Sequence, residues 1–219
     1  MEVYCIMPVI IELSKYSNIE NAIGEVLSID GNRITIYVYP ERFQDISMGD
    51  MLIVKSDYVN PILVIDRNIH KARREQGFTP IRVGIEEFRR LYPDSEYYYM
   101  YVTSGLYVSY ADSNGVLFLS IGASPNVHDL AFKLDSNDRI KLFLKGSEIS
   151  FDILRYIFWD KIDIMLFREF LIKNIDVLRK LGSIAELIGP LSRSIITLTR
   201  NHVVFKNLIK EFIEVLSNM

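Results

Sequence analysis

The chain has 219 residues, of which 49% are hydrophobic, so it can bury a continuous core, and global disorder is a poor interpretation. Its formal net charge of -3 gives no overall positive field for nucleic acid or an anionic membrane, so a nucleic-acid contact would need a local basic patch. Charges interrupt every apolar run before the ~20 residues of a spanning helix. With a single Cys5 and no secretion signal, we expect a cytoplasmic protein that is not inserted in a membrane.

Short strand patterns begin at residue 22 and follow one another through the first part of the chain. In AIGEVLSIDGNRITIYVYP, apolar residues alternate on both sides of Asp30-Gly31, a pair that tolerates positive φ, and this predicts a β-hairpin. Met48-Gly49-Asp50 predicts a turn into a strand at 51–54, and Pro61–Ile65 predicts a further strand. Four short strands in close succession predict a small antiparallel barrel, because closure removes exposed strand edges.

The middle of the chain predicts a charged excursion, a helix and further strands. His70–Pro80 (HKARREQGFTP) is expected to be a charged loop, and Gly84–Leu91 a short helix. Tyr97–Tyr110, Gly115–Ile121 and Ile140–Leu144 are expected to be strands.

The hydrophobic period changes from two to 3.6 near Ser147. Helices are expected near 148–159, 161–181, 183–200 and 201–217, with breaks at Gly182 and at Gly189-Pro190. The predicted fold is therefore α+β: a small antiparallel β-barrel domain over residues 1–146, followed by a C-terminal helical segment over 147–219 that forms a bundle or an interface.

The order of the motifs in the first of these domains resembles that of the HAS-barrel, a module shared by HerA-type DNA translocases and rotary ATP synthase subunits. The matching features are Ile23-Gly24 with a following valine, the Gly49-Asp50 turn into an apolar strand, and the closing strand Ile62–Ile65. The resemblance is best over residues 20–70. It implies a docking and assembly module, since in HerA-type systems the barrel end meets the partner nuclease, NurA.

The ATPase core that follows the barrel in HerA-type proteins has no counterpart in this sequence. Lys145-Gly146-Ser147 follows an apolar run, but the chain has no G-x-x-x-x-G-K-[ST] loop to hold phosphates. The three histidines, His70, His128 and His202, lie far apart without metal-ligand spacing. We therefore predict a protein that is not an enzyme and that uses no cofactor or metal.

Two features indicate binding surfaces in the predicted barrel. The densest basic run contains His70, Lys71, Arg73 and Arg74, which would contact phosphate or simply form a solvated loop. The tyrosines between 97 and 110 would either fill the barrel or stack on a partner or on bases.

A third feature lies in the last predicted helix. Its apolar stripe includes Val204, Phe205, Leu208 and Phe212, which predicts a partner interface, with self-association as the simplest outcome. The alternative is a monomer in which the helices wrap the barrel.

Two hypotheses of function follow from these features. The first is a non-catalytic interaction or assembly protein, an accessory of a HerA/NurA-type DNA-end-processing machine involved in DNA repair. The second is a small-barrel nucleic-acid-binding protein, which the net negative charge disfavours.

Overall fold

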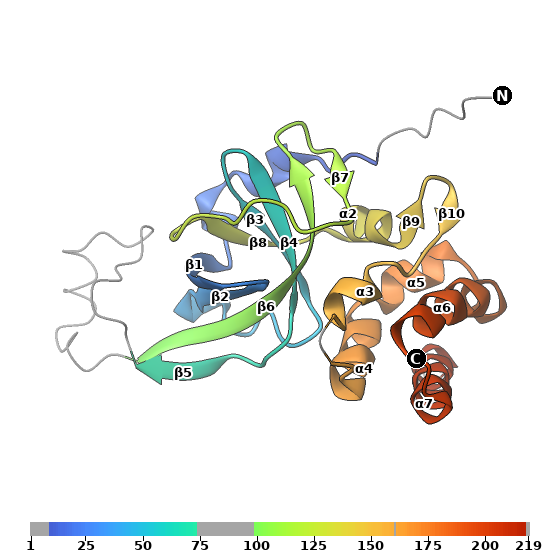
Figure 1. Cartoon of the computed structure of the whole chain (residues 1–219). Coiled ribbons are helices and arrows are strands. Elements are labelled where there is room, and N and C mark those ends of the chain that lie inside the picture. The colour runs from blue at the N-terminus through green and yellow to red at the C-terminus, as the bar shows by residue number, and fades with distance from the viewer. Residues whose placement is uncertain (1–8, 74–98, 160, 218–219) are drawn as a thin grey trace, which may run out of the picture.

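The computed structural model describes residues 9–73, 99–159 and 161–217 of the chain (Figure 1). Its strands are β1 (Gly24–Asp30), β2 (Arg33–Val38), β3 (Met51–Lys55), β4 (Val59–Ile65), β5 (His70–Arg73), β6 (Tyr99–Asp112), β7 (Leu117–Phe118), β8 (Leu130–Lys133), β9 (Leu144–Lys145) and β10 (Glu148–Ile149). Its α-helices are α2 (Ser136–Arg139), α3 (Leu154–Ile157), α4 (Ile164–Lys173), α5 (Ile175–Leu181), α6 (Ile184–Leu198) and α7 (His202–Ser217). Short 3-10 helices span Leu13–Tyr16, Ile19–Asn21, Pro40–Arg42 and Ile140–Phe143.

Six strands of the described residues form a closed antiparallel barrel, and the helices lie mostly C-terminal to it. Going around the ring, β1 pairs with β2, β2 with β6, β6 with β4, β4 with β3, β3 with β8, and β8 with β1. The prediction of an α+β fold with a small barrel followed by helices is confirmed. The closing strand β8 was missed, because four residues are too few for a clear alternating pattern.

Alternation along the strands separates two faces of the barrel wall. The apolar residues of one face fill the barrel interior: Val26, Ile34, Ile36, Val38, Leu52, Val54, Leu63 and Ile65. Tyr37 and Tyr39 belong to the opposite face, as the alternation in β2 predicts. The predicted hairpin and the alternation of β2 are therefore present. In β1, where strict alternation predicts Leu27 on the same face as Ile23, a bulge between Val26 and Ser28 leaves Val26 in the interior cluster and Leu27 in the outer one.

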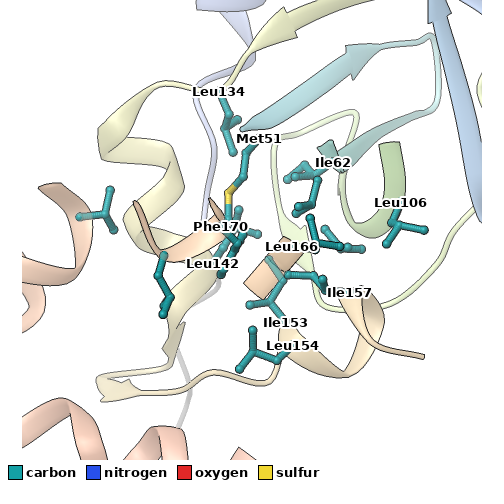
Figure 2. Close-up of a cluster of buried hydrophobic side chains, with 14 of the residues drawn as sticks. Met51, Ile62, Leu106, Leu134, Leu142, Ile153, Leu154, Ile157, Leu166 and Phe170 are labelled. Atoms are coloured by element: carbon teal, nitrogen blue, oxygen red, sulfur yellow. The ribbon is translucent and has the colours of Figure 1, made fainter. Parts of the chain in front are cut away.

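The outer face of the barrel is also apolar, and the helices cover part of it. Figure 2 shows Met51 and Ile62 from the barrel in the same cluster as Ile157, Leu166 and Phe170 from the helices. All five side chains are at most 5% exposed. One hydrophobic core thus runs across the predicted domain boundary at residues 146 and 147, and that boundary stays a prediction.

A barrel turn contacts the backbone of α4 directly. Gly49 has a φ of 89°, and a Cβ atom there would lie 2.5 Å from the carbonyl carbon of Glu169. The next residue, Asp50, is 4% exposed and lies 3.7 Å from Lys173 Nζ and 3.1 Å from Lys133 Nζ. The Met48-Gly49-Asp50 turn predicted from the sequence therefore also anchors the helical segment.

Several predicted elements in the middle of the chain differ from the structure. Ile140–Leu144 is mainly a 3-10 helix rather than a strand, because a short apolar run fits either structure. Gly115–Ile121 contains only the two-residue strand β7. His70–Arg73 is strand β5, paired with β6, rather than part of a loop. The helix predicted at Gly84–Leu91 lies outside the described residues.

The helical predictions are right in type and wrong in several boundaries. The region 148–159 contains β10 and the one-turn helix α3. The predicted helix 161–181 is divided into α4 and α5 at Asn174, whose buried side-chain amide donates a hydrogen bond to the carbonyl of Phe170. Gly182 ends α5 as predicted, but Gly189-Pro190 lies inside α6. Among the described helices, none combines the length and the apolar character needed to cross a bilayer.

Candidate interaction surfaces

The described part of the predicted basic run, His70–Arg73, forms β5, an outer strand of the sheet. His70 and Lys71 are exposed, and Lys71 pairs with Tyr101 of β6. The Nζ atom of Lys71 lies 5.8 Å from the centroid of the Tyr101 ring, within the range of a cation–π interaction. Arg74 lies outside the described residues, and the structure describes only the backbone of Arg73.

The predicted tyrosines do not form one surface. Tyr101 is half-buried and stacks on Phe43, with ring centroids 5.5 Å apart and an interplanar angle of 15°. Tyr107 points into the barrel interior cluster, and Tyr110 stacks on Phe118. Tyr97 and Tyr98 lie outside the described residues. Of these tyrosines, the structure therefore brings Tyr101 together with Lys71, and it adds Phe43, which sequence reasoning missed.

A cleft of about 440 Å³ lies between the barrel wall and the connection from α3 to α4. Arg33, Asp66 and Leu106 line it from the barrel. Trp159, Lys161 and Leu166 line it from the helical side. Trp159 is the only tryptophan of the chain, and it is 77% exposed. Sequence reasoning did not single out this residue, because neither its spacing nor its neighbours predict that it faces solvent.

The two carboxylates that line the cleft among the described residues, Asp66 and Asp163, already accept hydrogen bonds from donors of the protein. Asp66 accepts hydrogen bonds from Arg33 Nε at 3.0 Å and from the Ser104 hydroxyl at 2.5 Å, and its Oδ2 lies 2.8 Å from Arg33 Nη2. Asp163 caps α4 by accepting from the backbone N–H groups of Met165 and Leu166. These contacts fix the polar side of the cleft, whereas Trp159 and Lys161 remain exposed.

The predicted interface on α7 is largely turned toward the interior of the chain. Leu208 and Phe212 are 0% exposed, and the Phe212 ring meets the Phe151 ring at a centroid distance of 6.2 Å. Val204 and Phe205 are partly buried against the same core. The prediction is therefore corrected for Leu208 and Phe212, which are not accessible to a partner, because α7 packs them against neighbouring helices.

One of the three histidines has a buried partner. His128 has a φ of 74°, and its Nδ1 lies 3.0 Å from Oε2 of Glu25, whose side chain is 0% exposed. The Tyr39 hydroxyl donates to the other oxygen of Glu25 at 2.6 Å. This cluster joins β1 to the segment before β8, so it supports barrel closure. Among the described residues, no three histidine, cysteine or acidic side chains are grouped to hold a metal ion.

The fold defines the class of this protein as an α+β protein with a closed six-strand antiparallel barrel followed by helices. Comparison of the chain with protein-family models finds no match, and comparison with curated proteins finds no relative. The HAS-barrel relationship therefore stays a proposal.

Proposed function

We propose that this chain is a non-catalytic interaction protein and that a partner protein binds over the cleft beside Trp159. The observation that supports this is the 77% exposure of Trp159 at the rim of the cleft. Tryptophan contributes a large apolar area to a contact and is enriched among the residues that dominate binding energy.

The residues around Trp159 suggest the chemistry of the partner. In the first turn of α4, Ile164 is 37% exposed and Met165 is 68% exposed, which extends the apolar surface along the chain. Lys161 adds an exposed positive charge at the cleft. A partner that places an apolar side chain against Trp159 and an acidic residue near Lys161 would complement this surface.

The resemblance to the HAS-barrel suggests where such a partner acts. Barrels of this family serve as docking modules, so the finer proposal is an accessory role in a HerA/NurA-type DNA-end-processing machine. Self-association through the same surface is the simpler version of the proposal, and it predicts a wild-type mass in solution above that of one chain.

The test compares two exposed aromatic residues. Trp159→Ala should weaken binding to purified HerA-type translocase or NurA-type nuclease, or lower the mass of a self-assembly measured by light scattering. Tyr58→Ala is the matched control, because Tyr58 is 82% exposed but lies in the turn before β4, at the opposite end of that strand from Asp66 in the cleft. Equal effects of the two variants, or no binding and a monomeric wild type, would contradict the proposal.

A nucleic-acid-binding function is the second candidate, supported by the Lys71, Tyr101 and Phe43 group. Phe43 is 43% exposed, so a base could stack on its outer side while Lys71 contacts a phosphate. Such binding should weaken as salt increases, and Lys71→Gln should reduce both the affinity and the salt slope in fluorescence anisotropy with a single-stranded oligonucleotide. Binding that Lys71→Gln leaves unchanged would count against this surface.

A further inference from the structure

A second cleft, of about 270 Å³, lies where the β9–β10 hairpin, α3 and α6 meet. Three cations line it, and each comes from a different element: Lys145 from β9, Arg155 from α3 and Arg193 from α6. Two carboxylates, Asp152 and Glu148, line the same cleft, so its lining carries a small excess of positive charge in a chain of net charge -3.

The donor groups of these cations are only weakly engaged by the protein. The Nζ atom of Lys145 and an Nη of Arg155 lie 3.8 Å and 3.5 Å from the carboxylate of Asp152. Both distances exceed the 2.7–2.9 Å typical of charge-assisted hydrogen bonds. Within the part of the chain that the structure describes, Arg193 makes no ion pair. Asp152 therefore holds two cations near each other without occupying most of their N–H donors.

The hydroxyl group of Ser150 adds a neutral donor to the same cleft. The Ser150 oxygen accepts a hydrogen bond from the backbone N–H of Asp152 at 3.2 Å, so its own proton remains available. Ser194 also lines the cleft and is 5% exposed. The Thr197 hydroxyl donates to the carbonyl of Ser194 at 2.6 Å, so it offers only its lone pairs.

Two carboxylates, Asp152 and Glu148, are the groups in the cleft that would repel an anion. The three cations outnumber them, and Asp152 lies nearest to the cations that it orients. The volume is below the ~300–1,000 Å³ of sites for drug-sized ligands, which favours a small anion over a whole nucleotide.

We propose that this cleft binds a phosphate group, with Arg193 as the main ligand and with Lys145, Arg155 and the Ser150 hydroxyl around it. The guanidinium of arginine matches two phosphate oxygens at once, which a lysine ammonium cannot do. The site differs from a nucleotide-binding loop, because Lys145 and Glu148 pair across the tight turn Gly146-Ser147 and contribute side chains rather than a row of backbone amides. It is independent of the Trp159 surface.

The first experiment measures binding of inorganic phosphate to the full chain by 31P line broadening and thermal shift, with sodium chloride holding ionic strength constant. Phosphate should raise the melting temperature above the chloride reference, as a ligand of the native state does. Arg193→Gln should weaken phosphate binding by about tenfold or more, because glutamine removes both the charge and the paired N–H donors that face the phosphate oxygens.

Arg200→Gln is the matched control, because Arg200 is also exposed and follows α6 without lining the cleft. Arg193→Gln should keep the wild-type melting temperature in chloride, which separates lost binding from lost folding. Phosphate effects equal to those of chloride, or equal affinities of the two variants, would overturn the proposal.

The second experiment distinguishes two sources of the phosphate group. A thymidine oligonucleotide that binds, loses affinity in Arg193→Gln and is displaced by phosphate would identify the nucleic-acid backbone as the source. Phosphate binding without oligonucleotide binding would identify a free phosphate or a small phosphorylated molecule. Both outcomes require the phosphate site, whereas oligonucleotide binding that is insensitive to Arg193→Gln and to phosphate would count against this cleft.

Discussion

At the scale of single residues, Gly49 shows most directly how the barrel meets the helices. Its positive φ disfavours any side chain, and the backbone of Glu169 fills the space where a Cβ would be. Gly31 also has a positive φ, of 58°, but no atom lies within 4 Å of its ideal Cβ position. A side chain at Gly31 would therefore meet only backbone strain, whereas a side chain at Gly49 would meet both backbone strain and a steric clash with α4.

Alanine substitutions at these glycines should differ clearly in stability. Gly31→Ala should lower the free energy of unfolding by ~1 kcal/mol through strain alone. Gly49→Ala should lower it by ~3 kcal/mol, because the clash with α4 adds to the same strain. Urea denaturation of both variants measures the difference, and equal losses would mean that the turn does not press on α4.

Tyr107 predicts a loss of stability at alkaline pH. Burial raises the pKa of Tyr107 from 10.0 to about 12. The neighbouring Tyr110 adds to this rise, whereas the hydrogen bond from the N–H of Gly122 reduces it. A folded-state pKa above the unfolded value means that the stabilisation is complete below pH ~10 and is lost as pH rises through about 12. Tyr107→Phe should flatten the dependence of the free energy of unfolding on pH in that window, whereas a variant with an unchanged slope would assign the dependence to other groups.

At the scale of elements, α7 separates a buried face from an exposed one. Phe212 contacts the core and is 0% exposed, whereas Val203, at the start of the same helix, is 67% exposed. Other described residues of the buried face are Leu208, Val215 and Leu216. The amphipathic pattern of this helix therefore serves folding of the chain itself rather than only an interface.

Substitutions on the two faces of α7 should report this difference. Phe212→Ala should lower the free energy of unfolding by ~3–5 kcal/mol, because it leaves a cavity in the core. Val203→Ala should change it by less than ~0.5 kcal/mol. Thermal melts measure both values, and a stable, fully folded Phe212→Ala variant with a lower mass by light scattering would restore the original interface interpretation.

At the scale of the whole molecule, the barrel and the helices share one hydrophobic core. Met51 and Ile62 of the barrel belong to the same buried cluster as Leu166 and Phe170 of α4 (Figure 2). The ion pair of Asp50 with Lys173 crosses the same boundary. Two parts that bury each other's apolar surface are expected to lose their structure together.

Unfolding should therefore be a single cooperative transition. Trp159 fluorescence reports on the α3–α4 connection, and far-ultraviolet circular dichroism reports on all elements. The two signals should change at the same denaturant concentration. If the helical part of the circular dichroism signal were lost at a lower denaturant concentration than the rest of that signal, the segment after residue 146 would be shown to unfold as a separate unit.

The sequence by itself determined the elements whose signal is local. Alternation around Asp30-Gly31 specified the first hairpin and the face of β2 that enters the barrel, because the strand period and the turn need no distant residue. It did not specify the inward side chains of β1, where a bulge between Val26 and Ser28 shifts the register. The change of period near Ser147 likewise indicated where the chain becomes mainly helical. A helical face can be recognised from spacing, so the apolar stripe of α7 was also visible.

Only the tertiary structure decided what those faces contact and which side chains stay exposed. The stripe that includes Phe212 could cover a partner or the chain's own core, and packing against neighbouring helices selected the core. Trp159 had no spacing signal, since its exposure depends on how α3, α4 and the barrel wall meet. The cations Lys145, Arg155 and Arg193 are separated in sequence and converge only because β9, α3 and α6 surround one cleft. Periodicity is a property of neighbours along the chain, whereas the burial of a helix face and the convergence of distant side chains depend on long-range packing. For this reason the fold class could be predicted from the sequence, and the candidate sites could not.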